Sequence, residues 1–344
     1  MDTSALTDMV WRGVYSLAPV TSFLLGLMVM ESYRLIRLRS IMVGILVGGI
    51  SALFAVYVND AIMTTLRIPF EIYSPYGAPV VEELLKAGLL IYLIERGKVG
   101  FAIDATIYGF ALGTGFALVE NSVYLMQLQN APLSLWIIRG FGTAIMHGGT
   151  TALFGVISKL LIDRKGSGRW PYLVGLIPAA FFHSLYNHFF FPPLINTLLT
   201  LIVLAVMLGA VFHIGEKFMR QWVSQGMDSD LDSLEEVRSG RMSQTNAGRF
   251  LLSIRNQFPP EVVFDMLALY QLQLELSVRA KAILMMRESD MPVMITGEDR
   301  DRAREWHYLQ KSVGRTALLM MSPLFYGSRQ DIWQLQMILK ETRS

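Results

Sequence analysis

The pattern of apolar and polar positions divides the chain into two parts of different character. A helix needs about 20 predominantly apolar residues to cross the hydrocarbon core of a bilayer. Seven segments approach that length, some only if their polar residues face the interior of a bundle. These segments are 14–33, 41–58, 76–94, 101–127, 135–162, 170–191 and 194–212. The pattern therefore predicts an all-α fold over residues 1–213, a polytopic membrane helix bundle with about seven transmembrane helices.

The last third of the chain has the pattern of a soluble helical domain. Residues 214–248 are mostly polar and predict a linker. Pro260 then opens an apolar-periodic run, as proline often does in a first helical turn, and two further helical patterns cover 299–321 and 330–342. We expect residues 249–344 to form a cytoplasmic helical domain. It carries no chemical motif, so we expect it to regulate, or to bind a partner such as a second copy of the chain, and not to catalyse.

Composition supports a membrane protein and excludes several kinds of site. The chain is 53% hydrophobic and 17% charged, which is unlike an ordinary soluble domain. The absence of cysteine excludes disulfides, thiolate metal ligands and a cysteine nucleophile. No basic stripe with interleaved aromatic residues is present, so nucleic acid is not an expected partner. Residues 59–75 mix apolar and polar positions and are interpreted as an interfacial loop or a short amphipathic helix.

Basic residues in the loops predict the orientation, because cytoplasmic loops carry an excess of Lys and Arg. One set of loops holds nine basic residues and the opposite set holds two, Arg12 and Arg67. The nine are Arg34, Arg37, Arg39, Arg96, Lys98, Lys159, Arg164, Lys165 and Arg169. We therefore expect a multi-pass protein of the inner cell membrane, with its N-terminus outside and its C-terminal domain in the cytoplasm.

Ionisable residues inside the apolar segments mark a candidate site. Glu82, Glu83 and Lys86 lie within 76–94, and a charge at the bilayer centre costs roughly 2.5–3.5 kcal/mol on insertion scales. The alternative interpretation is a helix end whose charged side chains extend to the interface. That alternative is weakened because three other segments also carry ionisable residues, namely Glu120, His147 and His183.

The expected topology places most of these residues at one depth. Glu82, Glu120 and His183 each lie about six to eight residues from the outer end of their segment, which is roughly 9–12 Å at 1.5 Å per residue. His147 lies deeper and would join them if its helix tilts. Glycines such as Gly113 would let these helices pack closely. The pattern thus predicts one polar site near the outer face.

This set of residues suits the activation of water. The chain has no His-Glu-x-x-His motif, no Gly-x-Ser-x-Gly motif and no pair of aspartates in its apolar segments. A glutamate shielded from water can act as a general base. Lys86 shares a helix face with Glu82 and Glu83 and can hold one of them ionised. The histidines can donate to an oxyanion or bind a metal, and Asn187, four residues after His183, can add a neutral donor.

Four short motifs follow one another along the chain. They are Glu82-Glu83-x-x-Lys86, Phe116-x-x-x-Glu120-Asn121, His147 and His183-x-x-x-Asn187. Together they resemble the PrsW family of glutamate-dependent intramembrane proteases, over roughly residues 15–212. That family is similar to the CAAX-protease and bacteriocin-processing superfamily, whose second motif has histidine where this chain has Glu120. The resemblance implies an intramembrane endopeptidase that cuts a membrane-anchored protein, such as an anti-sigma factor, and it does not extend to the C-terminal domain.

Roles can be assigned from the motifs and their chemistry. The predicted catalytic residues are Glu82, Glu83, Glu120, His147, His183 and Asn187, with Glu82 polarising the attacking water. The predicted supporting residues are Lys86, Phe116, Asn121 and Arg139. The sequence does not require a cofactor. If a divalent metal such as zinc is used, its candidate ligands are Glu120, His147 and His183. The shared depth predicts a cut near the outer face of the membrane.

Two other classes of function would also place acids and histidines in a membrane. An ion- or proton-coupled transporter would use them as a relay, and it would often show an inverted repeat, which the sequence does not. A non-catalytic receptor or scaffold of the same fold would tolerate Glu82→Gln. Cleavage of a substrate by the purified protein, with and without a chelator, distinguishes both from a peptidase.

Overall fold

A computed structural model describes residues 3–33, 35–128, 130–165, 168–325 and 329–342 of the chain. The described residues form helices and connecting turns, with no β-strand among them, so the all-α prediction is confirmed. The chain divides into two compact units, Met1–Glu216 and Lys217–Ser344, called here the membrane unit and the C-terminal unit.

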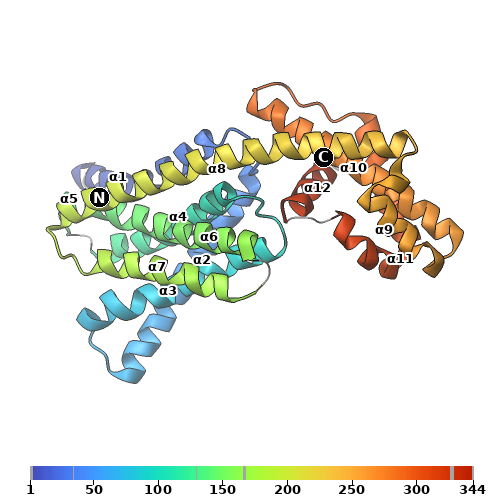
Figure 1. The fold of residues 1–344 in the computed structure, drawn as a ribbon. Coiled ribbons are helices and arrows are strands. Elements are labelled where there is room, and N and C mark those ends of the chain that lie inside the picture. Colours follow the sequence, from blue (N-terminus) through green and yellow to red (C-terminus); the bar gives the residue numbers. More distant parts are fainter. Residues whose placement is uncertain (1–2, 34, 129, 166–167, 326–328, 343–344) are drawn as a thin grey trace. The chain divides into compact units, whose positions relative to one another are not determined.

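The membrane unit contains a helix or helical span at each segment that the hydrophobic pattern predicted (Figure 1). They are α1 (Thr3–Met30), α2 (Leu38–Leu66), α3 (Phe70–Glu95), α4 (Ala102–Gln127), α5 (Leu133–Ile138), the π-helix η1 (Arg139–Ala144), α6 (Ile145–Lys165), α7 (Trp170–Asn187) and α8 (Pro193–Arg238). Within the described residues, five spans are long and apolar enough to cross a membrane: α1, α2, α4, the continuous α5–η1–α6 span and α8. Helices α3 and α7 coincide with the other two predicted segments, and the count of seven crossings stays a prediction.

Helix α4 is the central helix of the membrane unit and packs against α1, α2 and α6. Glycines allow this packing, because a Cβ atom at Gly113 would lie 2.2 Å from the carbonyl oxygen of His147, and one at Gly115 would lie 1.9 Å from that of Ile45. Any larger residue would push the helices apart. The contact at Gly113 brings α4 and α6 together at the level of the candidate site.

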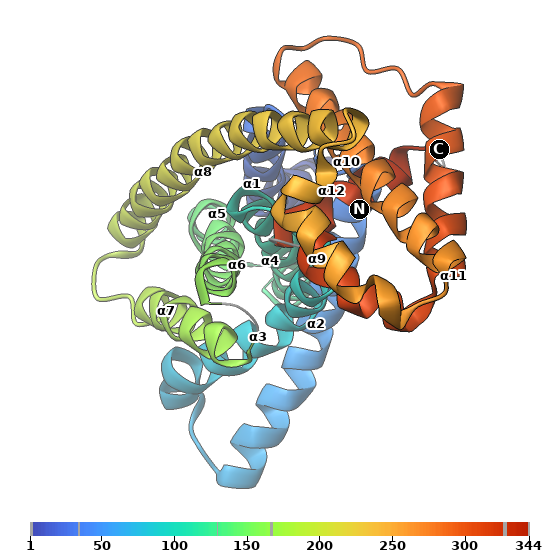
Figure 2. The ribbon, with the colours of Figure 1, turned by 45° about the vertical axis from the view of Figure 1, so that its right-hand side comes forward.

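The mixed stretch 59–75 is mostly helical. Helix α2 continues to Leu66, Arg67 follows with a left-handed backbone (φ 53°), and α3 begins at Phe70. The connection is therefore three residues long, and most of the stretch belongs to α2 and α3 and forms neither the interfacial loop nor the separate short helix that the sequence suggested. In Figures 1 and 2 the second half of α2 and the first half of α3 form a hairpin that extends away from the neighbouring helices of the membrane unit.

The C-terminal unit is a second helical body with its own core. It contains the end of α8, η2 (Met242–Gln244), α9 (Asn246–Ile254), η3 (Arg255–Gln257), α10 (Pro260–Glu288), α11 (Gly297–Phe325) and α12 (Arg329–Glu341). Residues such as Leu269, Ile283 and Met321 are buried in that core. Helices α10, α11 and α12 coincide with the three predicted helical patterns. Residues 214–238 of the predicted linker instead continue α8 as a helix, and the domain boundaries stay a prediction.

One basic residue counted for the orientation lies inside the membrane unit. Lys159 is fully buried in α6, and its ammonium is 2.6 Å from the carboxylate of Asp163. Another, Arg34, lies outside the described residues. The expected orientation therefore depends on the remaining loop residues.

Candidate active site

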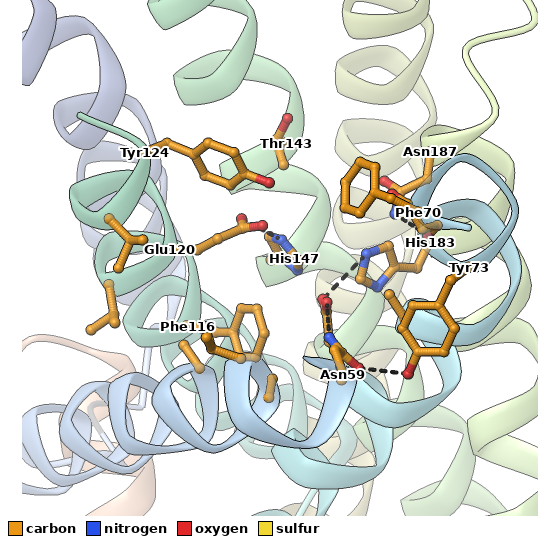
Figure 3. Close-up of a pocket in the computed structure, with 18 of the residues that line it drawn as sticks. Asn59, Phe70, Tyr73, Phe116, Glu120, Tyr124, Thr143, His147, His183 and Asn187 are labelled. Carbon is orange, nitrogen blue, oxygen red and sulfur yellow. Dashed lines mark hydrogen bonds and ion pairs between the residues drawn. The ribbon is translucent and has the colours of Figure 1, made fainter. Parts of the chain in front are cut away.

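A pocket of about 530 Å³ opens between α2, α3, α4, η1, α6 and α7. Glu82, Glu120, His147 and His183 all line it, and Figure 3 labels the last three around the cavity. The rings of His147 and His183 meet edge to face, with 4.8 Å between their centroids. The structure therefore brings together four side chains from four helices, three of which the sequence placed at one depth.

Glu83 is the central carboxylate behind the pocket and does not line it. Its Oε1 atom lies 2.5 Å from Nζ of Lys86 and 2.9 Å from both Nδ1 of His183 and Oγ1 of Thr150. The hydroxyl of Thr151 donates to the other oxygen at 3.2 Å. Both oxygens are thus hydrogen-bonded, as a buried carboxylate requires. This geometry suits a residue that positions its neighbours.

The hydrogen bond to Glu83 sets the tautomer of His183. The Glu83 carboxylate is paired with Lys86 and accepts the hydrogen bond from His183. Nδ1 of His183 therefore carries the proton, and Nε2 is left with a lone pair. That Nε2 atom lies 3.6 Å from Oε2 of Glu82. His183 therefore presents an acceptor to the pocket.

Lys86 sets the opposite tautomer in His147. An ammonium cannot accept a hydrogen bond, so Lys86 donates to Nδ1 of His147 at 3.2 Å. The imidazole proton is therefore on Nε2. That N–H donates to Oε2 of Glu120 at 3.1 Å. The Phe116 ring supports the pair, because Lys86 Nζ lies 4.8 Å from its centroid and the His147 ring lies 4.9 Å from it. His147 thus presents a donor where His183 presents an acceptor.

Glu82 is oriented by two residues that the sequence reading missed. The side-chain amide of Asn59 in α2 donates to Oε1 of Glu82 at 3.2 Å. The hydroxyl of Tyr73 in α3 donates to Oδ1 of Asn59 at 2.8 Å, which fixes the amide with its N–H₂ toward Glu82. Both residues come from the α2–α3 hairpin. Its mixed polarity was visible in the sequence, but neutral polar residues beside an apolar segment give no specific signal.

Glu120 is held from the opposite side by Arg139 of η1. The guanidinium Nη2 lies 3.2 Å from Oε2 of Glu120, and the group stacks over the Tyr124 ring at 3.8 Å. Nε of Arg139 donates to Oδ1 of Asn121 at 2.9 Å, and Asn121 donates in turn to the carbonyl of Ser16 in α1. π-helical turns often occur at functional sites. This one places Arg139 beside Glu120.

Asn187 lines the same pocket, and its side-chain amide already donates one hydrogen bond. Its Nδ2 donates to the carbonyl of Ser74 at 3.2 Å, a bond that joins α7 to α3. A side-chain amide has two N–H groups, so one remains for another acceptor.

Three of the pocket residues have the arrangement of metal ligands. Glu82, His147 and His183 are buried, and each offers a ligand atom within 4.8 Å of the others. Two imidazoles and one glutamate form the ligand set of one class of catalytic zinc site. The set therefore fits a divalent metal, with Glu82 where the sequence reading had proposed Glu120. His183 already presents a lone pair on Nε2. Ligation through Nε2 of His147 would require the other tautomer, with the proton on Nδ1 in place of the hydrogen bond that Lys86 donates there.

The helix bundle and its buried glutamate–histidine pocket define a membrane-embedded protein with a hydrolase-like site. The protein-family model described as PrsW family intramembrane metalloprotease matches residues 34–214. Because the match covers more than half of the chain, the chain belongs to this family, and the resemblance seen in the motifs is confirmed. No curated protein and no solved structure matches the chain. Family membership makes the chain an intramembrane peptidase located in a membrane.

Proposed function

We propose that the chain cuts a membrane-anchored protein substrate, such as an anti-sigma factor, near the outer face of the membrane by attack of water on a peptide carbonyl. One observation carries the proposal: Glu82, Glu120, His147 and His183 converge in one pocket of the membrane unit. Hydrolysis needs a group that removes a proton from water and a group that returns one to the leaving nitrogen. The pocket offers carboxylates and imidazoles for both tasks.

In the proposed mechanism Glu82, His147 and His183 would hold a divalent metal such as zinc. When bound, such a metal polarises the substrate carbonyl and makes water a stronger nucleophile at neutral pH. Asn59 and Tyr73 fix the orientation of Glu82, and Glu83 fixes that of His183. These contacts orient two of the three side chains, Glu82 and His183, as partners behind metal ligands generally do.

Glu120 is the proposed proton carrier. It is a second glutamate in the pocket, next to the three side chains that would hold the metal, and Arg139 holds its carboxylate in place. It would take the proton of the attacking water and return it to the leaving nitrogen. The free N–H of Asn187 would stabilise the developing oxyanion. If chelation had no effect on cleavage, Glu82 would take the role of base that the sequence first suggested.

Cleavage by the purified protein tests this proposal. The substrates are single-pass reporters, each with a transmembrane segment from a membrane protein of the same cell between an outer and an inner tag. We expect wild-type protein in lipid nanodiscs to cut at least one reporter, to lose activity on chelation, and to regain it with added zinc. The proposal would be abandoned if no reporter were cut, or if His183→Ala and Glu120→Gln both cut at the wild-type rate.

A further inference from the structure

Helices α2 and α4 pack tightly along one half of their length and diverge along the other. A Cβ atom at Gly48 of α2 would lie 1.9 Å from the carbonyl oxygen of Leu112 of α4. Further along, Val56 and Met63 of α2 and Val123 of α4 all line the active-site pocket. Beyond the tight contact, the second half of α2 extends away from the neighbouring helices of the membrane unit (Figures 1 and 2). We call the gap between the diverging halves of α2 and α4 the α2–α4 opening.

The walls of the α2–α4 opening carry apolar side chains, among them Val56, Met63 and Val123, together with the polar side chains of Asp60 and Gln127. Val56 at its edge is 52% exposed, and its neighbours Leu53 and Phe54 are also exposed on α2. Val56 both lines the pocket and is exposed next to these two residues, so in a membrane the opening borders lipid at this position. Glu82 and His147 form the floor. The α2–α4 opening therefore accommodates a peptide with apolar side chains whose backbone is accessible to the residues of the floor.

A second groove lies on the other side of the site. It has a volume of about 260 Å³ and lies between α6, α7 and α8, where it is lined by residues such as Leu153, Phe182 and Val203. Among its described lining residues there is no acid and no histidine. A substrate in that groove would be separated from Glu82 by the wall of α6 and α7.

We propose that the membrane segment of the substrate reaches the site sideways from the bilayer, through the α2–α4 opening. This inference rests on the proposed function. A helical segment keeps its carbonyls in internal hydrogen bonds. The substrate therefore lies extended where it passes Glu82, with its side chains against Val56, Met63 and Val123. The bound species is a single apolar protein segment that is anchored in the same membrane.

Photocrosslinking tests the route directly. The probe is a single-pass reporter that wild-type protein cuts, combined with the Glu82→Gln variant so that it is not consumed. A benzophenone amino acid replaces Val56 or Val123 in the α2–α4 opening, or Phe182 or Val203 in the second groove. We expect crosslinks to the reporter's membrane segment from the first pair only. Crosslinks from the second pair alone, or from none of the four, would overturn the proposal. Because the reporter is chosen by its cleavage, those results would leave the proposed function standing.

A matched pair of substitutions gives a second test. Val56→Trp narrows the opening at a half-exposed position, and Phe54→Trp adds the same ring on the lipid-facing side, away from the pocket. We expect Val56→Trp to lower kcat/KM for the reporter by about tenfold or more, and Phe54→Trp to leave it unchanged. Equal activity of the two variants would count against the α2–α4 opening as the route.

Discussion

Lys86 sets much of the chemistry of the site although it does not line the pocket. Its ammonium is buried, lies 2.5 Å from Glu83 and donates to His147. Through Glu83 it also determines which nitrogen of His183 carries a proton. One buried cation thus gives two neighbouring imidazoles opposite tautomers. A buried ion pair adds little net stability, so a role in positioning is a better reason for Lys86 than folding energy.

The amide of Asn59 should matter for the chemical step. It donates to the Glu82 carboxylate at 3.2 Å, and a hydrogen bond to a charged group contributes about 1.5–3 kcal/mol. Asn59→Ala should therefore lower kcat by about ten- to hundredfold with little change in KM. Tyr73→Phe, which only frees the amide to rotate, should have a smaller effect in the same direction. Steady-state cleavage of a reporter measures both, and wild-type kcat in Asn59→Ala would refute this role.

The ion pair between Arg279 and Asp299 in the C-terminal unit predicts that the stability of this unit depends on pH. Burial alone raises the pKa of Asp299, but hydrogen bonds from the Arg279 guanidinium and the Thr296 N–H lower it overall. A lowered folded-state pKa stabilises the fold above the unfolded value of about 3.9, and this contribution is lost as pH falls through the folded value.

Asp299→Asn should therefore destabilise residues 217–344 clearly at pH 7 and much less at pH 3. Urea unfolding of that fragment, followed by circular dichroism, measures the difference. The fragment is expected to fold alone because the C-terminal unit has its own core. A difference between wild type and variant that grew toward pH 3 would contradict the assigned role of the Arg279 pair.

At the residue scale, the sequence pointed to ionisable residues and missed neutral ones. Glu82, Glu120 and the two histidines stood out because charge inside a bilayer is costly. Asn59 and Tyr73 carry no such cost and lie where the apolar pattern fades. Which glutamate completes the metal-binding group also depends on side-chain directions, and a linear pattern does not contain those directions.

At the scale of elements, the hydropathy pattern predicted where the apolar segments end, but the helices themselves extend further. Helix α2 extends to Leu66, beyond the apolar segment that ended near residue 58, and α8 continues to Arg238. The backbone hydrogen bonds of a helix continue across the boundary between membrane and water. A helix can therefore continue although its side chains become polar. For α2 this extension is functional in our account, because Asn59 and Met63 lie on it.

The close packing of α4 on α6 should be intolerant of any added side chain. A Cβ atom at Gly113 would lie 2.2 Å from the backbone oxygen of His147, and the rigid backbone cannot move aside easily. Gly113→Ala should therefore destabilise the protein by about 1–3 kcal/mol or more and displace His147. Gly88→Ala in α3, where nothing lies within 4 Å, is the matched control. Thermal unfolding in nanodiscs compares them, and equal stability would show that the two helices are less tightly packed than described.

For the whole molecule, orientation decides which side of the membrane the pocket serves. The remaining basic residues favour a cytoplasmic turn around Lys98 and an outer loop around Asn130. The chain has no cysteine, so single cysteines give an unambiguous signal. A membrane-impermeant maleimide should label Asn130→Cys in intact cells and should label Lys98→Cys only after lysis. The reverse pattern would invert the proposed topology and move the expected cut to the cytoplasmic side.

The central claim is that Glu82 serves peptide hydrolysis in the membrane unit. The most direct measurement is product analysis by mass spectrometry after cleavage of a single-pass reporter in water enriched in ¹⁸O. Glu71→Gln, the same substitution at an exposed position of α3 outside the pocket, is the control. We predict one cut near the outer end of the reporter's membrane segment, with ¹⁸O in the new carboxyl group, for wild type and Glu71→Gln. For Glu82→Gln, which would remove a metal-holding carboxylate, we predict a rate lower by about 100-fold or more, since loss of even an outer-shell partner of a metal site costs about 10–100-fold. Wild-type cleavage by Glu82→Gln would contradict the account.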